Sequence, residues 1–436
     1  MKTSRLTLAS LSNFEYLNFY IPASLGDGGT IVTVTTAVDV NGSQVNVGID
    51  GLSSPLREGD TVNLIDADNA SITGTPANTT SDGSGMLGVT LRYEFDILID
   101  NQILIATVTK AGVNEQTKSL SEGRLAGVAL VIEGADILVE SGIRSATDAS
   151  MGKRSDIFGK FGMDVFSSVS FGDLKYKTGS HINLRSVSFM IGLAKTAQIQ
   201  SKLLTLGVFF EYGKGSYDTF NSFALLDPVR ADGDTDYRGG GVLVRLDFSD
   251  NGDRNLYGEF SIRMGRTSNS YTSHDLQDSS GRRAAFDSSS MYYGFHLGAG
   301  YLRDITETTS VDIYGRYFWT KVDDDAVTLS TGERVDFGHV NSSRIRLGMK
   351  ISHEINSHLA AYAGAAFEHE FEGEAGAMTN GFYIPQPKLK GSMAIGELGL
   401  SLRPALDGRF SIDLGVQGHI GKRQGVAGSL NFKFSF

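Results

Sequence analysis

The chain has 436 residues, of which 40% are hydrophobic and 20% charged, and a formal net charge of -11. This length predicts two or three domains, and the composition excludes a wholly disordered chain. The acidic balance and the lack of a long Lys/Arg run argue against a nucleic-acid-binding protein. Cysteine is absent, which excludes disulfides, thiolate metal sites and cysteine nucleophiles.

The first residues make a poor signal peptide. Lys2 and Arg5 precede an apolar stretch at 6–11, but Ser and Thr interrupt it and no small-residue cleavage site follows. Because the remainder of the sequence predicts export, we expect the true N-terminus to lie far upstream. No run of about 18 uncharged apolar residues exists, so no lipid-surrounded helix that spans a membrane is predicted.

Residues 1–118 contain short strand-like stretches separated by Gly, Asn and Asp turns. They are 30–40, 44–49, 61–65, 88–99 and 102–109. No period is strict enough to define a repeat. A stacked β-solenoid end and a small β-sandwich both fit this pattern.

Residues 119–144 have apolar positions at helical spacing and no strand alternation. Ser119 and Glu122 match a capping box, which predicts that a helix begins there. At 1.5 Å per residue such a helix reaches about 36 Å, enough to cross the lumen of a barrel. Glu133, Asp136 and Glu140 form one acidic face, which a polar pore tolerates better than lipid does. A surface helix of the preceding domain fits the same periodicity.

Residues 155–436 predict about twelve strands with period-two alternation, each roughly 9 to 13 residues long. Their centres lie near residues 166, 189, 208, 242, 260, 297, 314, 348, 364, 397, 413 and 431. The last strand is the clearest, because Leu430, Phe432, Phe434 and Phe436 share one face. An even count of such strands fits a closed bacterial membrane barrel.

The predicted connections alternate in length. Short turns near 250–253, 303–306, 354–357 and 404–408 alternate with long polar stretches at 214–235, 267–290, 322–341 and 372–388. A bilayer imposes this sorting, with tight periplasmic turns and longer extracellular loops. Aromatic residues near strand ends suggest an interfacial girdle: Tyr212, Tyr257, Tyr293, Tyr301 and Trp319. The predicted fold class is all-β: a transmembrane barrel with a lumen helix, preceded by a β-solenoid-like segment.

Strand parity also predicts which basic side chains face the lumen. They are Arg245, Arg263, Arg316, Arg344, Arg346 and Lys350. We hypothesise that some of them pair with Glu133, Asp136 and Glu140. Pairing with neighbouring strands, or solvation, is the alternative. The histidines have no metal-ligand spacing, so we expect neither a metal site nor a cofactor.

Several segments carry a family resemblance: 408–416 (GRFSIDLGV), 421–426 (GKRQGV), 432–436 (FKFSF), 156–159 (DIFG) and 178–182 (TGSHI). With the predicted helix before them, the chain resembles the C-terminal part of the classical autotransporters (type Va secretion). The likeness covers about residues 119–436. It implies that 1–118 end a passenger (β-helix or autochaperone-like), that 119–154 form a linker helix through the pore, and that 155–436 form the translocator barrel.

The resemblance implies a non-enzymatic, monomeric outer-membrane protein of a Gram-negative bacterium that exports and displays its own passenger. The implied partners are outer-membrane lipid, periplasmic chaperones and the barrel-assembly machinery, which reads the C-terminal strand with Leu430, Phe432, Phe434 and Phe436. The missing signal sequence and passenger bulk depart from the family pattern, as does the lack of paired asparagines at the helix. Two other classes remain open: a general porin, and a barrel protease or lipase with groups such as His274 near its loops.

Overall fold

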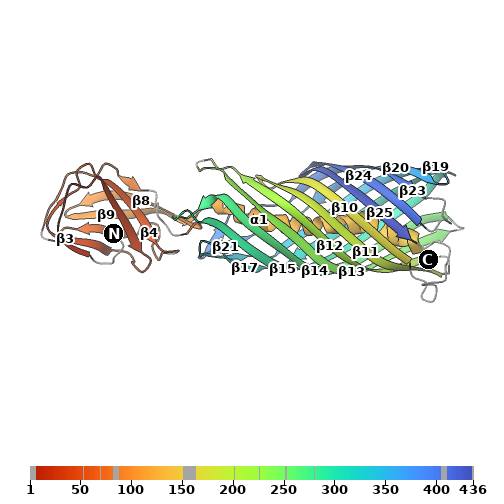
Figure 1. Ribbon diagram of the computed structural model, residues 1–436, viewed down its shortest axis with the longest axis horizontal. Coiled ribbons are helices and arrows are strands. Elements are labelled where there is room, and N and C mark those ends of the chain that lie inside the picture. Colours follow the sequence, from red (N-terminus) through yellow and green to blue (C-terminus); the bar gives the residue numbers. More distant parts are fainter. Residues whose placement is uncertain are drawn as a thin grey trace.

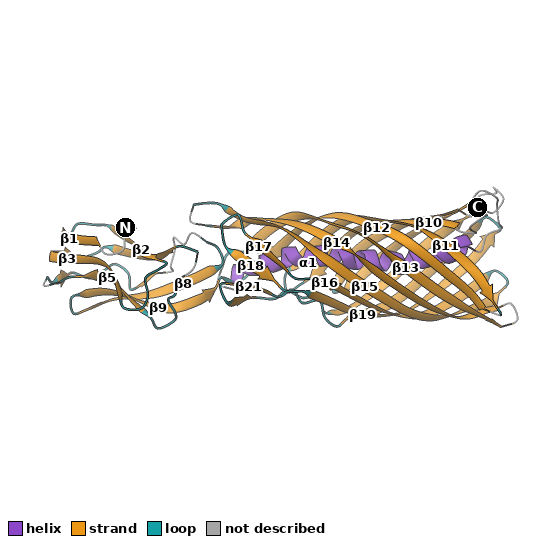
Figure 2. Cartoon of the chain, turned by 90° about the horizontal axis from the view of Figure 1, so that it is seen from below, coloured by secondary structure: helices purple, strands orange, loops and turns teal. Residues whose placement is uncertain are grey.

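The computed structural model describes residues 6–52, 54–68, 70–81, 88–150, 164–200, 202–224, 226–250, 253–278, 280–403 and 410–434. A small N-terminal unit of strands lies beyond one end of a long barrel, and a helix runs along the inside of that barrel (Figure 1 and Figure 2). Asp156–Gly159, one of the resembling segments, and Phe436 of the predicted assembly signal fall outside the described residues.

The N-terminal unit combines parallel and antiparallel strand pairs. Its strands are β1 (Leu6–Leu11), β2 (Tyr16–Pro22), β3 (Gly29–Asp39), β4 (Gln44–Asp50), β5 (Thr61–Asp66), β6 (Ile72–Thr73), β7 (Thr80–Ser81), β8 (Leu91–Asp100) and β9 (Ile103–Val113). The pairs β1–β3, β3–β5, β3–β6 and β2–β4 are parallel, whereas β8 and β9 form an antiparallel hairpin that joins β5. Inward Val, Ile and Leu side chains form its core.

Twelve strands form the closed antiparallel barrel that the alternation predicts. They are β10 (Asp164–Lys177), β11 (His181–Ile199), β12 (Lys202–Asn221), β13 (Val229–Asp250), β14 (Asp253–Gln277), β15 (Arg283–Thr306), β16 (Thr309–Val322), β19 (Val340–Asn356), β20 (Leu359–Glu370), β23 (Gly391–Leu402), β24 (Phe410–Gly421) and β25 (Arg423–Phe434). The last strand pairs with the first, which closes the barrel and leaves no sheet edge. The prediction of about twelve strands is confirmed.

Two of the predicted long loops are wrong. Most of 214–235 and 267–290 continues as strand, so β13 has 22 residues and β14 has 25. Their residues still alternate between inward and outward, but the outward face is polar and the inward face mixes apolar residues such as Val229 and Phe286 with Ser, Thr and Asn, so hydrophobicity does not reveal the strand. The other two long connections contain β17 (Asp325–Thr328), β18 (Arg334–Phe337), β21 (Ala377–Thr379) and β22 (Phe382–Ile384), which form a small sheet at the rim.

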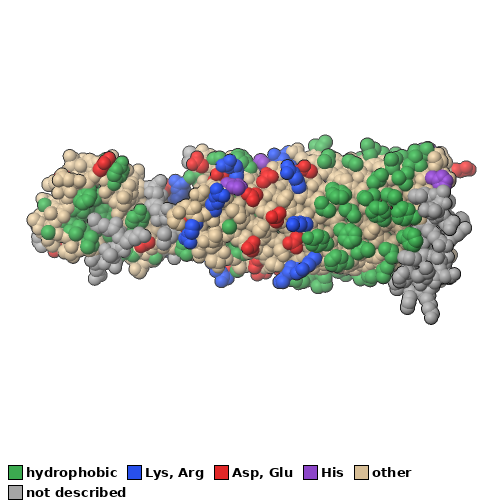
Figure 3. Space-filling model, in the orientation of Figure 1, with side chains coloured by type: hydrophobic (Ala, Val, Ile, Leu, Met, Phe, Trp, Pro, Cys, Tyr) green, Lys and Arg blue, Asp and Glu red, His purple; other side chains and the backbone are tan. Residues whose placement is uncertain are grey.

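The barrel has an apolar outer surface, and its interior holds buried charged side chains together with apolar ones. Val208, Ile262 and Leu347 are exposed on its outer surface, whereas charged side chains such as Arg346 are buried inside. Figure 3 shows the apolar side chains gathered into a band around the half of the barrel farther from the N-terminal unit. This inversion is what a lipid-facing barrel requires. Tyr257 does not join the predicted girdle, because its ring points inward and is 3% exposed.

Among the described helices, none is both long and apolar enough to cross a membrane.

The N-terminal unit contacts the rim sheet of the barrel through a few specific groups. The backbone N–H groups of Val89 and Thr90 both donate to the buried carboxylate of Glu333, which precedes β18. The Asn380 side chain donates to the carbonyl of Leu52 at 3.2 Å. Phe382 of β22 packs against the core of the N-terminal unit. The short strands at the rim therefore hold the unit at that end of the barrel.

Candidate functional site: the lumen helix and its anchors

The lumen holds one nearly continuous helical segment. A single 3-10 turn (Glu115–Thr117) leads into α1 (Lys118–Ile137), a π turn (Leu138–Gly142) follows, and α2 (Ile143–Ser150) ends the segment. The segment lies inside the barrel in both views (Figure 1 and Figure 2). Every residue of α1 after Lys118 is buried, and α1 packs against the inner faces of β11 to β14.

The predicted capping box does not form. Asn114 caps the 3-10 turn by accepting from the N–H of Gln116, and the N-cap of α1 makes no side-chain hydrogen bond. Glu122 instead accepts hydrogen bonds from Thr178 at 2.6 Å and Asn221 at 2.7 Å. The Glu122 carboxylate therefore binds side chains of the barrel wall. The capping-box motif predicts that it would bind the backbone at the start of the helix instead.

Glycines in α1 allow the helix to lie close to the barrel wall. A Cβ on Gly123 would come within 2.4 Å of the Tyr271 ring, and one on Gly134 within 2.4 Å of the Tyr237 hydroxyl. Each glycine costs about 1 kcal/mol of helix propensity relative to alanine. The close approach of helix and wall offsets that cost, because a side chain at these positions would push the helix away.

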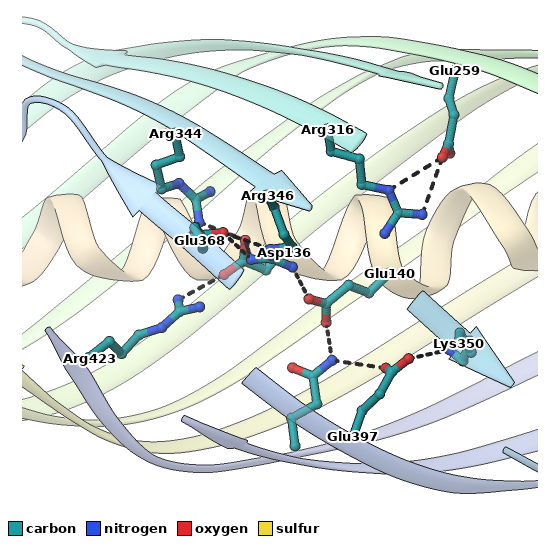
Figure 4. Close-up of polar contacts among 11 residues, drawn as sticks. Asp136, Glu140, Glu259, Arg316, Arg344, Arg346, Lys350, Glu368, Glu397 and Arg423 are labelled. Carbon is teal, nitrogen blue, oxygen red and sulfur yellow. Dashed lines mark hydrogen bonds and ion pairs between the residues drawn. The ribbon is translucent and has the colours of Figure 1, made fainter. Parts of the chain in front are cut away.

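Asp136 is the centre of the contacts between helix and wall. Its Oδ1 accepts from Arg344 at 2.9 Å and from Arg346 at 2.8 Å, and its Oδ2 accepts from Arg423 at 2.8 Å. Glu368 balances part of this positive charge, since it accepts from Arg344 at 3.0 Å and Arg346 at 2.7 Å. Figure 4 shows the three guanidinium groups converging on the one carboxylate. Side chains of β19 and β25 thus bind Asp136 directly, and Glu368 of β20 binds two of these arginines.

A second chain of contacts begins at Glu140. This carboxylate contacts Arg346 and accepts from the Gln417 amide at 2.6 Å. Gln417 lies 3.5 Å from Glu397, which forms an ion pair with Lys350 at 3.0 Å. Figure 4 follows this path from the helix to the wall. The π turn lies between Asp136 and α2, so the anchored residues flank or occupy the irregular turn.

Glu133 makes a different kind of contact from its two neighbours. It accepts hydrogen bonds from the Tyr176 hydroxyl at 2.7 Å and from the Ser186 hydroxyl at 2.5 Å. No described arginine forms an ion pair with it. The hypothesis that some wall arginines pair with the acidic face therefore has a geometric basis at Asp136 and Glu140, and not at Glu133.

The remaining predicted lumen residues lie inside the barrel but bind mainly to the wall. Arg245 pairs with Asp247 at 2.9 Å, and Arg316 pairs with Glu259 at 3.2 Å. Arg263 pairs with Glu211 at 2.9 Å and also donates to the backbone carbonyl of Val131, so it touches the helix without using a carboxylate there. These three arginines therefore pair with acids of the wall, but not with acids on adjacent strands. Arg245 and Asp247 share β13, whereas Arg263 and Arg316 each pair with an acid two strands away.

Sequence reasoning missed Arg423. Parity along β25 carries the signal, because Asn431 and Lys433 are predicted to face the lumen and Arg423 lies an even number of residues before them. The β10–β25 ladder keeps an unbroken register from Val165–Phe434 to Tyr176–Arg423. The same parity places Leu430, Phe432 and Phe434 outward, and Phe434 is 41% exposed.

The lumen is filled unevenly. Toward the N-terminal unit, α1 is packed on all sides by wall side chains. At the other end a polar cavity of about 370 Å³ lies beside the helix, lined by residues that include Arg144, Asp312, Lys350 and Glu397. While the helix is in the lumen, it obstructs passage along the barrel. If the helix left the lumen, the polar side chains of the wall would suit a hydrated polypeptide.

Comparison with known proteins gives a family match over the barrel. The family model "Autotransporter beta-domain" matches residues 167–417, which is more than half of the chain. A search among curated proteins gives no match.

Three solved structures illustrate the similarity. The transport unit of the autotransporter AIDA-I from Escherichia coli is 17% identical, covers 68% of this chain and 98% of its own, and has a TM-score of 0.46. The translocator domain of NalP from Neisseria meningitidis has values of 14%, 70%, 97% and 0.49. The β-domain of a Bordetella autotransporter, BrkA, has values of 12%, 63%, 99% and 0.46. On the match to the family model, the chain belongs to the autotransporter β-domain family.

Proposed function

We propose that residues 1–118 are the C-terminal end of a passenger, that 119–154 are the linker which follows it through the pore, and that 155–436 are the translocator barrel. The observation that supports this division is one helix inside a closed barrel, joined directly to a folded unit beyond one end. An outer-membrane translocator for its own passenger needs that arrangement. A general porin has no use for a helix that fills its lumen.

The parallel strand pairs β1–β3, β3–β5 and β2–β4 support reading 1–118 as the end of a stacked β-solenoid. The antiparallel hairpin of β8 and β9 would then close the stack on the side of the barrel. Once folded outside the membrane, such a unit is too wide to return through a lumen that holds one helix. Folding outside therefore gives export a direction without nucleotide hydrolysis.

Topology can be tested with single cysteines, because the chain has none of its own. Thr36 is exposed on β3, and Thr308 is exposed in the turn between β15 and β16 at the opposite end. We expect a membrane-impermeant maleimide to label Thr36→Cys in intact cells, and to label Thr308→Cys only after the outer membrane is permeabilised. Labelling of Thr308→Cys but not Thr36→Cys in intact cells would contradict the proposed topology.

We further propose that the outward aromatic face of β25, with Leu430, Phe432, Phe434 and Phe436, is read by the barrel-assembly machinery. Phe432 and Phe434 lie on the strand that closes the barrel against β10. If the assembly machinery recognises this face, replacing its residues should reduce assembly more than replacing other lipid-facing apolar residues does.

The assembly role can be tested by matched serine variants. Phe432→Ser with Phe434→Ser is expected to reduce the heat-modifiable, folded barrel in cells several-fold, while refolding in detergent changes little. Leu414→Ser with Val416→Ser, on the neighbouring strand β24, also removes two outward apolar side chains and is the control. Equal losses in cells for the two pairs would leave only a lipid-facing role for β25.

A further inference from the structure

The outer surface of four neighbouring strands changes from apolar to basic at one level. On β11 to β14, the first outward side chain beyond the apolar run, toward the N-terminal unit, is Arg185, Lys214, Arg238 or Arg266, and each is exposed. The apolar residues just below this row are Val187, Tyr212, Val242 and Met264, all at least 40% exposed. Figure 3 shows basic side chains, with acidic ones among them, along this border of the apolar band. We call these four residues the basic row.

Three of the four basic-row residues, Lys214, Arg238 and Arg266, form no ion pair with another described residue. Arg238 and Arg266 are direct partners in the β13–β14 ladder, a placement in which like charges repel. No described carboxylate forms an ion pair with Lys214, Arg238 or Arg266, although Asp236 lies opposite Lys214 in the ladder. Arg185 is 3.6 Å from Asp173, and both are highly exposed.

The pattern differs on later strands. On β16 the first outward residue beyond the apolar run is the basic Lys321, but it pairs with Asp323 at 3.0 Å. On β19 the first outward residue beyond the apolar run is Ser343, and on β20 it is His369. Arg185 and Lys214 also line a hollow of about 420 Å³ on the outer surface, which the carboxylates of Asp173 and Asp234 line as well. The basic side chains therefore border a concave surface that continues into the apolar band.

We propose that the basic row is a binding site for the phosphorylated headgroup of a lipid of the outer leaflet, whose acyl chains lie on the apolar band below. Guanidinium and ammonium groups bind phosphate oxygens through charge-assisted hydrogen bonds, and Arg can do so with two parallel bonds. The row faces the leaflet on the side of the N-terminal unit, which is the outer leaflet in a passenger-displaying barrel. A lipid phosphate bound beside Arg238 and Arg266 would relieve the repulsion between these two unpaired residues.

The binding test uses the full chain in nanodiscs of phosphatidylcholine that contain a minor fraction of bisphosphorylated lipid A, with retained lipid measured by native mass spectrometry. We expect the wild-type chain to retain lipid A, less so at high salt, and to retain no dephosphorylated lipid A above the phosphatidylcholine background. Each basic residue near an anionic lipid surface contributes roughly fivefold in affinity. The variant K214Q/R238Q/R266Q is therefore expected to bind lipid A roughly a hundredfold more weakly.

A charge-matched control separates a site from general electrostatics. The variant R230Q/R283Q/R334Q removes the same three positive charges from exposed positions farther from the apolar band, and we expect it to retain lipid A. Equal loss in the two variants would overturn the proposal. So would displacement of the lipid by inorganic phosphate at equal concentration, because the site would then recognise a free anion. Either failure would leave the translocator function untouched, since the topology test above does not depend on bound lipid.

Discussion

Replacing Asp136 with alanine is expected to destabilise the barrel by about 3–5 kcal/mol, the usual cost of removing one partner from a buried ion pair. Three guanidinium groups meet this carboxylate within 2.9 Å. Without it, Glu368 and Glu140 would remain beside Arg344 and Arg346, and Arg423 would have no described ion-pair partner. The helix would lose its main anchor, and the arginines would repel one another in the lumen. Urea unfolding of the purified chain in detergent measures the loss, with Trp319, its only tryptophan, as the fluorescent reporter.

Glu133→Gln is the matched control for the Asp136 variant. The amide oxygen can accept from one of the Tyr176 and Ser186 hydroxyls, and the amide NH2 can donate to the other once that hydroxyl rotates, so we expect a change within about 1 kcal/mol. Adding Arg423→Met to Asp136→Ala is expected to recover part of the lost stability, because one unpaired charge is removed as well. Asp136→Ala and Glu133→Gln with the same unfolding midpoint would refute the anchoring role of Asp136.

The same anchor should control the pore. With Asp136→Ala we expect more frequent open events in planar bilayers, because the weakened helix leaves its position more often. The ion network therefore holds the helix in the lumen. Its members come from β19, β20 and β25, so it is complete only when the barrel has closed.

Parity was the strongest guide to the fold. Period-two alternation predicted the twelve strands and placed Arg344 and Arg346 on the inner face, where both are buried. Alternation is sufficient for this because successive residues of a strand point to opposite faces of the sheet. The partners of those arginines could not be predicted in the same way. Asp136 lies 208 residues from Arg344 and 287 from Arg423, and only closure of the barrel brings them together.

The errors have one physical cause. Hydrophobicity marks a strand only where lipid faces one side of it, so the parts of β12 to β15 beyond the apolar band looked like loops. The capping box failed for a related reason, because Thr178 and Asn221 of the barrel take the Glu122 carboxylate. In both cases the pattern is present in the sequence, but contacts that exist only in the closed barrel determine which structure forms.

Gly123→Ala is expected to destabilise the barrel by about 1–2 kcal/mol, although alanine is the better helix former. Its Cβ would lie 2.4 Å from the Tyr271 ring. That ring cannot readily move, because it stacks on Phe286 at 5.0 Å and its hydroxyl is hydrogen-bonded to Ser119 at 2.7 Å. Overpacking of this kind costs about 1–3 kcal/mol, against about 1 kcal/mol gained in helix propensity.

Gly127→Ala tests the same change one turn later, where the nearest neighbour is the Thr235 hydroxyl at 3.3 Å. A shift of a few tenths of an ångström accommodates the methyl group there, so the gain in helix propensity should dominate. We expect Gly127→Ala to be neutral or to stabilise by up to about 1 kcal/mol in the same urea unfolding measurement. The two variants should thus differ in sign. If both stabilise the protein, the helix does not touch the wall at Gly123 as closely as the geometry requires, and the lumen has room to spare.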